Sequence, residues 1–291
     1  MRAVNDIQAL LEQDDGPIVA PGAWDGLSAR LIERAGFAAV CSSGYAVSAS
    51  LGMPDIELYT ATENLAAIRH IREACALPMV ADIDTGYGNA VNVMRTVSAA
   101  EAAGATALFM EDQIAPKRCP ICVADPVDVL PIDEAAGKVR AAATVKRPRT
   151  VLIARCDAYG DEALRRLEAY REAGADLLMP VTKTFSSVEE WATCSEQLGG
   201  GLVATLTSGT WVEREFTDDV MRQIGVRIAL LPNQAIHAAA KAIEDALGRM
   251  HAGTDPAEVS ADAMPHADFI EMLGFQEALE QQALYMPATL S

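Results

Sequence analysis

The stretch PMVADIDTGYG, residues 78–88, is the part of the sequence that decides the fold. It begins with an apolar run that has no polar face, and it passes directly into two aspartates and a glycine-containing turn. A short run that is apolar on both sides is typical of a strand buried in a parallel sheet. In parallel α/β folds the functional side chains follow the carboxyl ends of such strands. Residues 78–82 are therefore predicted to form a buried strand, and residues 82–88 its functional exit.

Seven similar runs, separated by segments with helical periodicity, occur between residues 17 and 231. Several helical segments end in a glycine, such as Gly104 or Gly174, which suits a helix end before a tight turn. Eight strand–helix units predict an α/β fold of the closed (β/α)8 TIM-barrel type. An open doubly wound sheet is the alternative, but no G-x-G-x-x-G motif follows the first run. The eight predicted strands are residues 17–20, 38–42, 78–82, 106–111, 150–155, 176–180, 201–206 and 226–231.

The composition is that of one large soluble enzyme-sized domain. The chain has 291 residues, 51% of them hydrophobic, and a formal net charge of −18. We expect a barrel domain over residues 1–250, which starts with a short amphipathic helix in residues 1–15, and a helical extension over residues 251–291. The acidic balance argues against a nucleic-acid partner, and no apolar run is long enough to span a bilayer. The six cysteines lie mostly in apolar surroundings, which favours a reducing cytoplasm.

The extension contains two predicted helical segments, residues 264–273 and 275–285. Both carry large apolar side chains, for example Phe269, Leu279 and Tyr285. Helices added to a finished barrel need a surface that buries such side chains. That surface is either their own barrel or a partner subunit, and the sequence does not separate the two.

The strongest candidate site is a set of acidic residues at the predicted strand exits. Asp82 and Asp84 are two residues apart, so on a continuing strand both side chains point to one side. Together with Glu111, which ends the next strand, they would repel one another unless a cation lay between them. A few carboxylates completed by waters are typical of a Mg²⁺ or Mn²⁺ site. Helix capping by these acids is the alternative, and a lysine ammonium among them would argue against a metal.

A second candidate lies after the fourth strand, where Lys117, Arg118 and Cys119 are consecutive. Two neighbouring cations are expected to lower the pKa of the thiol and make it a candidate acid, base or nucleophile. The connection from residue 113 to residue 130 is long for a barrel and is predicted to be a lid. An exposed loop with an incidental cysteine is the alternative. Cys122 completes a C-x-x-C pair, which lacks a second ligand pair for zinc but leaves a regulatory or accidental disulfide open.

Five stretches are similar to motifs of one family: PGAWDGLSARLIERAGF (21–37), SSGYAVSASLGMPD (42–55), ADIDTGYGN (81–89), FMEDQIAPKRC (109–119) and IARCDA (153–158). In this combination the sequence resembles the isocitrate lyase/phosphoenolpyruvate mutase superfamily, and its lyase branch in particular. The resemblance implies a (β/α)8 barrel whose last helix is exchanged between subunits of a homotetramer, a dimer of dimers. It also implies a small carboxylate substrate and a Mg²⁺ cofactor.

The resemblance also implies roles for individual residues. Mg²⁺ would be held by Asp82, with Asp84, Glu111 and Asp55 acting through waters. Lys117, Arg118 and Cys119 match a gating loop that brings a catalytic thiol to the leaving carbanion, and Arg155 would bind and stabilise the reacting acid. The residues expected to contact the substrate are Ser43, Gly44 and Tyr45, together with Thr205 and Asn233 at later strand exits.

The sequence departs from the lyases at four positions. Pro120 and Ile121 stand where Gly-His is usual, Val181 replaces a glutamate, and Thr205 replaces an asparagine. Fewer polar groups would then contact additional carboxylates, so a substituted malate fits better than isocitrate, although a methylisocitrate-like acid stays open. The expected activity is Mg²⁺-dependent carbon–carbon cleavage of a small 2-hydroxy or 2-keto acid through a metal-stabilised enolate. The alternatives are an oxaloacetate decarboxylase or hydrolase, a phosphonopyruvate-type P–C bond enzyme, and a catalytically degenerate binding protein.

Overall fold

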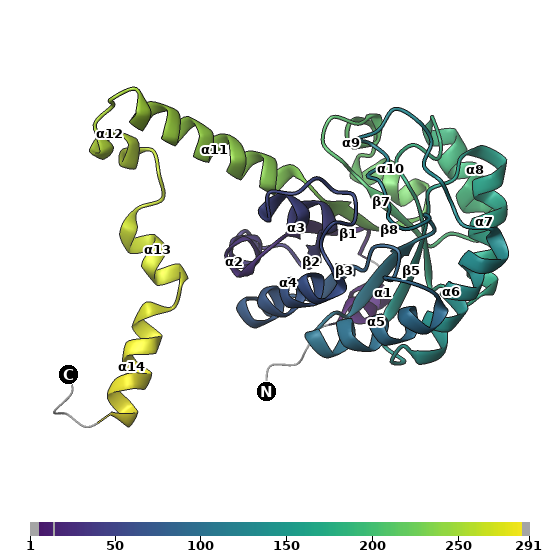
Figure 1. The fold of residues 1–291 in the computed structure, drawn as a ribbon, viewed down its shortest axis with the longest axis horizontal. Coiled ribbons are helices and arrows are strands. Elements are labelled where there is room, and N and C mark those ends of the chain that lie inside the picture. Colours follow the sequence, from purple (N-terminus) through teal and green to yellow (C-terminus); the bar gives the residue numbers. More distant parts are fainter. Residues whose placement is uncertain (1–5, 14, 287–291) are drawn as a thin grey trace. The chain divides into compact units, whose positions relative to one another are not determined.

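The computed structural model describes residues 6–13 and 15–286, and its centre is a closed barrel of eight parallel strands in sequential order (Figure 1). Each predicted run overlaps one strand, and the last run matches β8 at both ends. The prediction of a TIM barrel is therefore confirmed. The strands are β1 (Ile18–Ala23), β2 (Val40–Ser42), β3 (Met79–Asp82), β4 (Ala107–Glu111), β5 (Val151–Cys156), β6 (Leu177–Pro180), β7 (Leu202–Thr205) and β8 (Val226–Leu231).

Helices surround the barrel and alternate with its strands (Figure 1). Their ends follow local sequence signals: the Asn89 side chain accepts hydrogen bonds from the first amides of α5, and Gly104 ends that helix with a φ of 112°. Gly174, after α7, has a φ of 105°, so both glycines lie in the left-handed region that a side chain disfavours. The helices of the barrel are α1 (Ile7–Gln13), α2 (Gly26–Arg34), α3 (Gly44–Ser50), α4 (Ala61–Ala74), α5 (Ala90–Ala103), α6 (Ile132–Val145), α7 (Gly160–Glu172), α8 (Val188–Leu198), α9 (Trp211–Glu215) and α10 (Asp218–Gln223).

Two apolar clusters hold the barrel together, one on each side of the strands. Side chains at alternate strand positions, such as Val80 and Ile153, fill the interior of the barrel. Their chain neighbours, such as Leu152, belong to the layer between strands and helices. This alternation follows from the two-residue period of a strand. It also explains why the strands are apolar on both faces, as the sequence indicated.

Helix α1 closes the amino-terminal end of the barrel. Ile7 is fully buried within the interior cluster, and Leu10 and Leu11 pack against it. The Arg227 side chain donates a hydrogen bond of 2.6 Å to the backbone oxygen of Leu11. This helix confirms part of the helix predicted over residues 1–15, of which residues 1–5 and 14 lie outside the described residues.

A second compact unit begins at His237, inside α11 (Gln234–His251), so the predicted division after residue 250 falls at the end of this helix. The unit also contains α12 (Pro256–Ala261), α13 (His266–Met272) and α14 (Phe275–Tyr285). The last two helices confirm the two predicted segments, whereas α12 was not predicted. Within the unit, Arg249 forms an ion pair of 2.6 Å with Asp262. Large apolar side chains of the unit are exposed, among them Ile243, Leu247, Phe269, Leu273, Phe275, Leu279, Leu284 and Tyr285.

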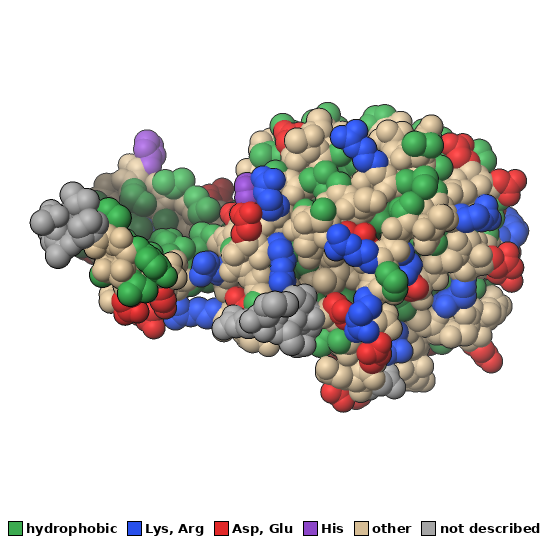
Figure 2. Space-filling model, turned by 90° about the horizontal axis from the view of Figure 1, so that it is seen from below, with side chains coloured by type: hydrophobic (Ala, Val, Ile, Leu, Met, Phe, Trp, Pro, Cys, Tyr) green, Lys and Arg blue, Asp and Glu red, His purple; other side chains and the backbone are tan. Residues whose placement is uncertain are grey.

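The surface charges of the barrel are mixed. On the face shown in Figure 2, basic and acidic side chains lie interspersed, and the basic ones form no continuous track on that face. Among the described residues, no helix combines the length and the apolar character that a membrane span requires.

Candidate active site

A cavity of about 610 Å³, its opening to solvent included, lies at the carboxyl end of the barrel. It is lined by residues at the strand exits and by the connection between β4 and α6. The predicted site residues that line it are Ser43, Tyr45, Asp55, Asp82, Lys117, Cys119, Arg155, Thr205 and Asn233. The remaining four, Gly44, Asp84, Glu111 and Arg118, are not among its lining residues.

The lining side chains converge because strand positions alternate between the two faces. Val80 and Ile153 point into the barrel, and the residues two positions later are Asp82 and Arg155. These two side chains therefore continue the inner face to the mouth of the barrel. The alternation along each strand, read from its buried residues, thus indicates which exit residues continue the inner face. Glu111 has this parity, two positions after Phe109, but it pairs with Arg155 and does not line the cavity.

Asp82 is the carboxylate at the cavity floor. It is 6% exposed, and its two oxygens accept amide hydrogen bonds from Gly44 (3.2 Å) and Asp84 (3.0 Å). The Asn64 side chain donates 2.8 Å to the backbone oxygen of Asp82, which fixes the end of β3. Burial, followed by the charge of Asp84, raises the pKa of Asp82 to about 7. The side chain is thus held in place by amides, and among the described residues the nearby cations pair with other carboxylates.

Asp84 does not point into the cavity, which corrects the prediction that it shares a strand face with Asp82. Strand β3 ends at Asp82, and Asp84 has a φ of 49°, so the strand period no longer applies. Its carboxylate accepts hydrogen bonds from the hydroxyls of Tyr59 (2.6 Å) and Tyr87. A left-handed residue just after a strand is rare for a side chain larger than glycine, and the two tyrosines were not predicted to contact it.

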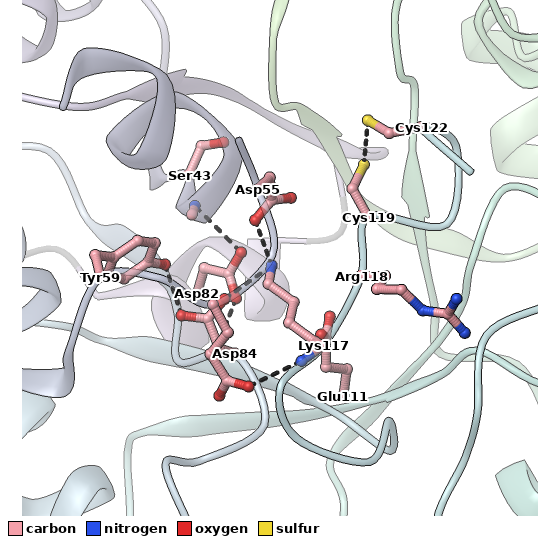
Figure 3. Close-up of polar contacts among 12 residues, drawn as sticks. Ser43, Asp55, Tyr59, Asp82, Asp84, Glu111, Lys117, Arg118, Cys119 and Cys122 are labelled. Carbon is pink, nitrogen blue, oxygen red and sulfur yellow. Dashed lines mark hydrogen bonds and ion pairs between the residues drawn. The ribbon is translucent and has the colours of Figure 1, made fainter. Parts of the chain in front are cut away.

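Lys117 holds the other oxygen of Asp84. Its ammonium nitrogen lies 2.8 Å from Asp84 Oδ1 and 2.8 Å from Asp55 Oδ1, and the side chain is 2% exposed (Figure 3). Burial opposes the charge, but the surrounding carboxylates raise the pKa of Lys117 well above its usual range. The ammonium is therefore charged, and it occupies the space between two of the predicted metal-binding carboxylates.

Glu111 and Arg155 form the other half of the charged cluster. These residues are paired across β4 and β5, and Arg155 lies 2.5 Å from Glu111 Oε2 and 2.7 Å from Asp157 Oδ1. Both carboxylates are fully buried. Burial raises the pKa of Glu111 well above its usual range, and Arg155 only partly opposes this. Asp157, which sequence analysis did not single out, helps to position the guanidinium of Arg155.

The cluster fits a divalent cation at one place. Two cations, Lys117 and Arg155, lie among five carboxylates: Asp55, Asp82, Asp84, Glu111 and Asp157. Glu111 Oε1 is buried without a hydrogen-bond partner among the described residues. Mg²⁺ in proteins is commonly held by one or two carboxylates and several waters. The donor set suits an ion held by Asp82, with Glu111 nearby.

A site in which several carboxylates bind one ion directly does not fit. Among the described residues, no three Asp, Glu, His or Cys side chains are placed to hold a metal ion together. The expected convergence of Asp82, Asp84 and Glu111 on one cation is therefore not seen. Lys117 neutralises Asp84 and Asp55, so this arrangement does not make them direct ligands.

The thiol of Cys119 lines the cavity, but its pKa shifts in the direction opposite to the prediction. Burial, followed by the charge of Asp55 and the contact with Cys122, raises its pKa, and Lys117 opposes the rise only in part. The prediction of a lowered pKa was wrong because the side chain is 5% exposed and the loss of hydration outweighs the neighbouring charge. Burial therefore keeps this thiol protonated at neutral pH, which is the form that a general acid needs, while the raised pKa makes it a weaker acid than a free thiol.

Arg118 is not part of the cavity, which corrects its prediction as a catalytic residue. Its side chain is 41% exposed, points away from the cluster (Figure 3) and lies 3.3 Å from the exposed Asp128. Its backbone amide donates a hydrogen bond to Gln113, which shapes the loop. Consecutive residues in an irregular loop point in different directions, so Lys117 and Arg118 cannot both face the site.

The turn after β2 supplies the predicted substrate-binding residues. The Ser43 hydroxyl caps α3 and donates a hydrogen bond of 3.0 Å to the backbone oxygen of Pro232. The Asn233 side chain accepts a hydrogen bond of 3.0 Å from the amide of Ser208, joining the exits of β7 and β8. Sequence analysis missed two further hydroxyl residues of the cavity, Thr182 and Thr207. Their signal was present, because each lies two residues after the end of a strand.

We expect Gly44→Ala to destabilise the fold by about 1–3 kcal/mol, the usual cost of overpacking. A Cβ at this position would lie 2.7 Å from Asp82 Oδ2 and 2.8 Å from the Tyr59 hydroxyl. The control is Gly137→Ala in α6, where a Cβ meets no atom within 4 Å and should stabilise by about 0.5–1 kcal/mol. Urea unfolding measures both. Equal stability of Gly44→Ala and wild type would show that this close approach is not required.

The comparisons with known proteins agree with this geometry. The family model for phosphoenolpyruvate phosphomutase matches residues 7–251. The chain is 36% identical to a 2,3-dimethylmalate lyase of Eubacterium barkeri over 274 residues, which cover 92% of this chain and 93% of that protein. A solved oxaloacetate acetylhydrolase in complex with 3,3-difluorooxalacetate is 31% identical, with a TM-score of 0.86 and 96% of each chain covered. A phosphonopyruvate hydrolase solved with oxalate and Mg²⁺ is 32% identical, with a TM-score of 0.85 and 97% and 98% of the two chains covered.

A closed parallel barrel with a charged cavity at its carboxyl end defines the class of (β/α)8 proteins that carry their sites on strand exits. Within that class, the chain belongs to the phosphoenolpyruvate mutase/isocitrate lyase superfamily, as its motifs indicated. Its relatives are enzymes that include a carbon–carbon lyase, an oxaloacetate acetylhydrolase and a phosphonopyruvate hydrolase. One of them was solved with Mg²⁺.

Proposed function

We propose that the protein is a Mg²⁺- or Mn²⁺-dependent carbon–carbon lyase for a small 2-hydroxy acid of the alkyl-substituted malate class. The proposal rests on the set of side chains that line the cavity at the carboxyl end of the barrel. Cys119, Arg155 and Asp82 line it together with the apolar side chains of Pro120, Ile121 and Val181, which we call the apolar wall. The similarity to a 2,3-dimethylmalate lyase supports the same substrate class. Substrates with a further carboxylate, such as a methylisocitrate-like acid, would place that charge against the apolar wall.

The reaction divides into loss of a proton, cleavage of a bond and gain of a proton. A base takes the hydroxyl proton, the bond between C2 and C3 breaks, C2 becomes a keto carbon, and the electron pair goes to C3. A bound divalent cation would stabilise negative charge on the substrate oxygens as a Lewis acid. Arg155, held by Glu111 and Asp157, is preorganised to stabilise the same charge. Cys119, protonated because of its burial, donates a proton to C3.

The apolar wall selects the substituents of the substrate. Pro120, Ile121 and Val181 line the cavity, and Ile121 and Val181 stand at the positions where the resemblance implies a histidine and a glutamate in the lyases. One methyl group in an apolar pocket changes kcat/KM by about 10- to 200-fold. A malate with alkyl groups is therefore preferred over malate itself, because only its substituents contact this wall.

A screen of 2-hydroxy and 2-keto diacids with and without Mg²⁺ tests the proposal. We expect release of a 2-keto acid from an alkyl malate such as 2,3-dimethylmalate, faster than from malate, and loss of this activity in EDTA with recovery on adding Mg²⁺. Hydrolysis of oxaloacetate alone would instead favour hydrolase chemistry, which the similarity to an oxaloacetate acetylhydrolase makes the second candidate. Cleavage of phosphonopyruvate, followed by phosphorus NMR, would favour P–C bond chemistry. Binding of oxalate without turnover of any acid would indicate a binding protein.

The oligomeric state belongs to the same proposal. The second unit exposes large apolar side chains on α13 and α14, including Phe269, Leu273, Phe275 and Leu279. Such side chains are usually buried in a subunit interface when a soluble protein retains them. A homo-oligomer, a dimer of dimers with exchanged C-terminal helices, would bury them.

A further inference from the structure

The geometry points to Cys119 and Cys122 as a reversible oxidation site, at which a disulfide bond removes the thiol from the cavity. The Cys122 thiol donates a hydrogen bond to Cys119 Sγ, and the two sulfur atoms are 2.8 Å apart (Figure 3). Both cysteines are free thiols. The effect on turnover rests on the proposed function, whereas formation of the disulfide does not.

The backbone between the two cysteines already has a suitable shape. The amide of Cys122 donates a hydrogen bond of 3.0 Å to the backbone oxygen of Cys119, so residues 119–122 form a turn. In such a turn the first and last Cα atoms are less than about 7 Å apart. A disulfide needs Cα atoms about 4.4–6.8 Å apart, so the bond can form without unfolding the loop.

The two thiols differ in exposure in the way that an oxidation site requires. Cys122 is exposed, whereas Cys119 is buried at the cavity. The remaining cysteines are buried, and each lacks a thiol partner among the described residues: Cys41, Cys75, Cys156 and Cys194. An oxidant in solution therefore meets Cys122 first, and Cys119 is the thiol within reach. Cytosolic disulfides, where they occur, are usually transient or redox-sensing.

Peroxide is the chemical class of oxidant that balances the reaction. The Cys122 thiolate attacks one peroxide oxygen, the O–O bond breaks, and a sulfenic acid and hydroxide form; the hydroxide becomes water with the proton that the Cys122 thiol had released. The sulfur of Cys119 then attacks the oxidised sulfur, an S–S bond forms, and the Cys119 proton leaves with the sulfenic hydroxyl as a second water. The two thiols lose two electrons in total, and hydrogen peroxide is reduced to water. Cys119 has then lost the proton that it donates in the proposed reaction.

The sequence makes the disulfide easy to detect. Trypsin cleaves after Arg118 and Lys138, so both cysteines lie in one peptide, residues 119–138, which contains no other cysteine. After treatment with hydrogen peroxide and alkylation without reductant, we expect this peptide to be unalkylated and lighter by two hydrogens. Turnover of the alkyl malate should fall in parallel to below about a tenth, and dithiothreitol should restore both.

Cys122→Ser is the matched variant. It leaves Cys119 in place and does not line the cavity, so we expect basal turnover close to wild type and little loss in peroxide. Absence of the cross-linked peptide in wild type, or equal loss of turnover in Cys122→Ser, would overturn the inference. A cross-linked enzyme with full turnover would retain the oxidation site and contradict the acid role of Cys119. An untreated enzyme that turns over no acid would count against the proposed function, while the peptide still reports on the disulfide.

Discussion

Cys119→Ser is expected to lower kcat by about 10²- to 10⁴-fold, the range by which a positioned general acid accelerates a reaction. Serine is similar in size, but its hydroxyl is a far weaker acid than a thiol and transfers its proton poorly. KM should change little, because proton donation acts in the transition state. Steady-state kinetics with the preferred alkyl malate in Mg²⁺ measures both constants.

The same experiment separates the proposal from its main competitor. Decarboxylation or hydrolysis of oxaloacetate needs no proton from this thiol, so full activity of Cys119→Ser would remove the lyase role of Cys119. The variant should also keep its unfolding midpoint and its affinity for Mg²⁺, because Cys119 is not among the residues that hold the proposed ion. A loss of structure, seen by circular dichroism, would make the kinetic result uninformative, and Cys119→Ala then serves as the second variant.

Arg155→Gln should lower the free energy of unfolding by about 3–5 kcal/mol, the cost of removing one partner from a buried ion pair. Its guanidinium lies between Glu111 and Asp157, and both carboxylates are fully buried. Glutamine has a similar shape but no charge, so two carboxylates lose their nearest cation. Urea unfolding in EDTA measures the change and prevents a bound ion from compensating.

Arg118→Gln is the control for this prediction. The side chain of Arg118 pairs with the exposed Asp128, and such surface pairs contribute about 0–1 kcal/mol. Each variant removes one positive charge. The difference between their changes in the free energy of unfolding therefore measures the effect of burial. A change below about 1 kcal/mol for Arg155→Gln would mean that the buried pairs of Arg155 contribute no more to stability than a surface pair.

Much of the fold was predictable because its signals are local. Each strand is a short run that is apolar on both faces, and glycines such as Gly104 mark where helices end. The inner face of each strand then identifies the exit residues that enter the cavity, such as Asp82 and Arg155. These positions follow from the strand period, which the sequence displays directly.

The site was less predictable where the backbone leaves a regular period. Asp84 follows Asp82 by two residues, but its backbone is left-handed and its carboxylate contacts Tyr59 from another segment and Tyr87 from the same turn. Arg118 follows Lys117, yet only Lys117 is buried among carboxylates. The pKa of Cys119 depends on how far the loop buries it, which depends on the fold as a whole. Patterns along the chain do not contain this information.

The amino-terminal plug formed by α1 has a consequence for the timing of catalysis. Ile7 is buried in the cluster that fills the barrel interior, so the cavity is reached from the carboxyl end of the barrel. In the proposed reaction, the substrate and both products would then pass through the mouth of the cavity, whose lining includes Lys117 and Cys119. Movement of the segment that carries these two residues, which the ion pairs of Lys117 with Asp55 and Asp84 hold in place, would then affect the timing of both entry and release.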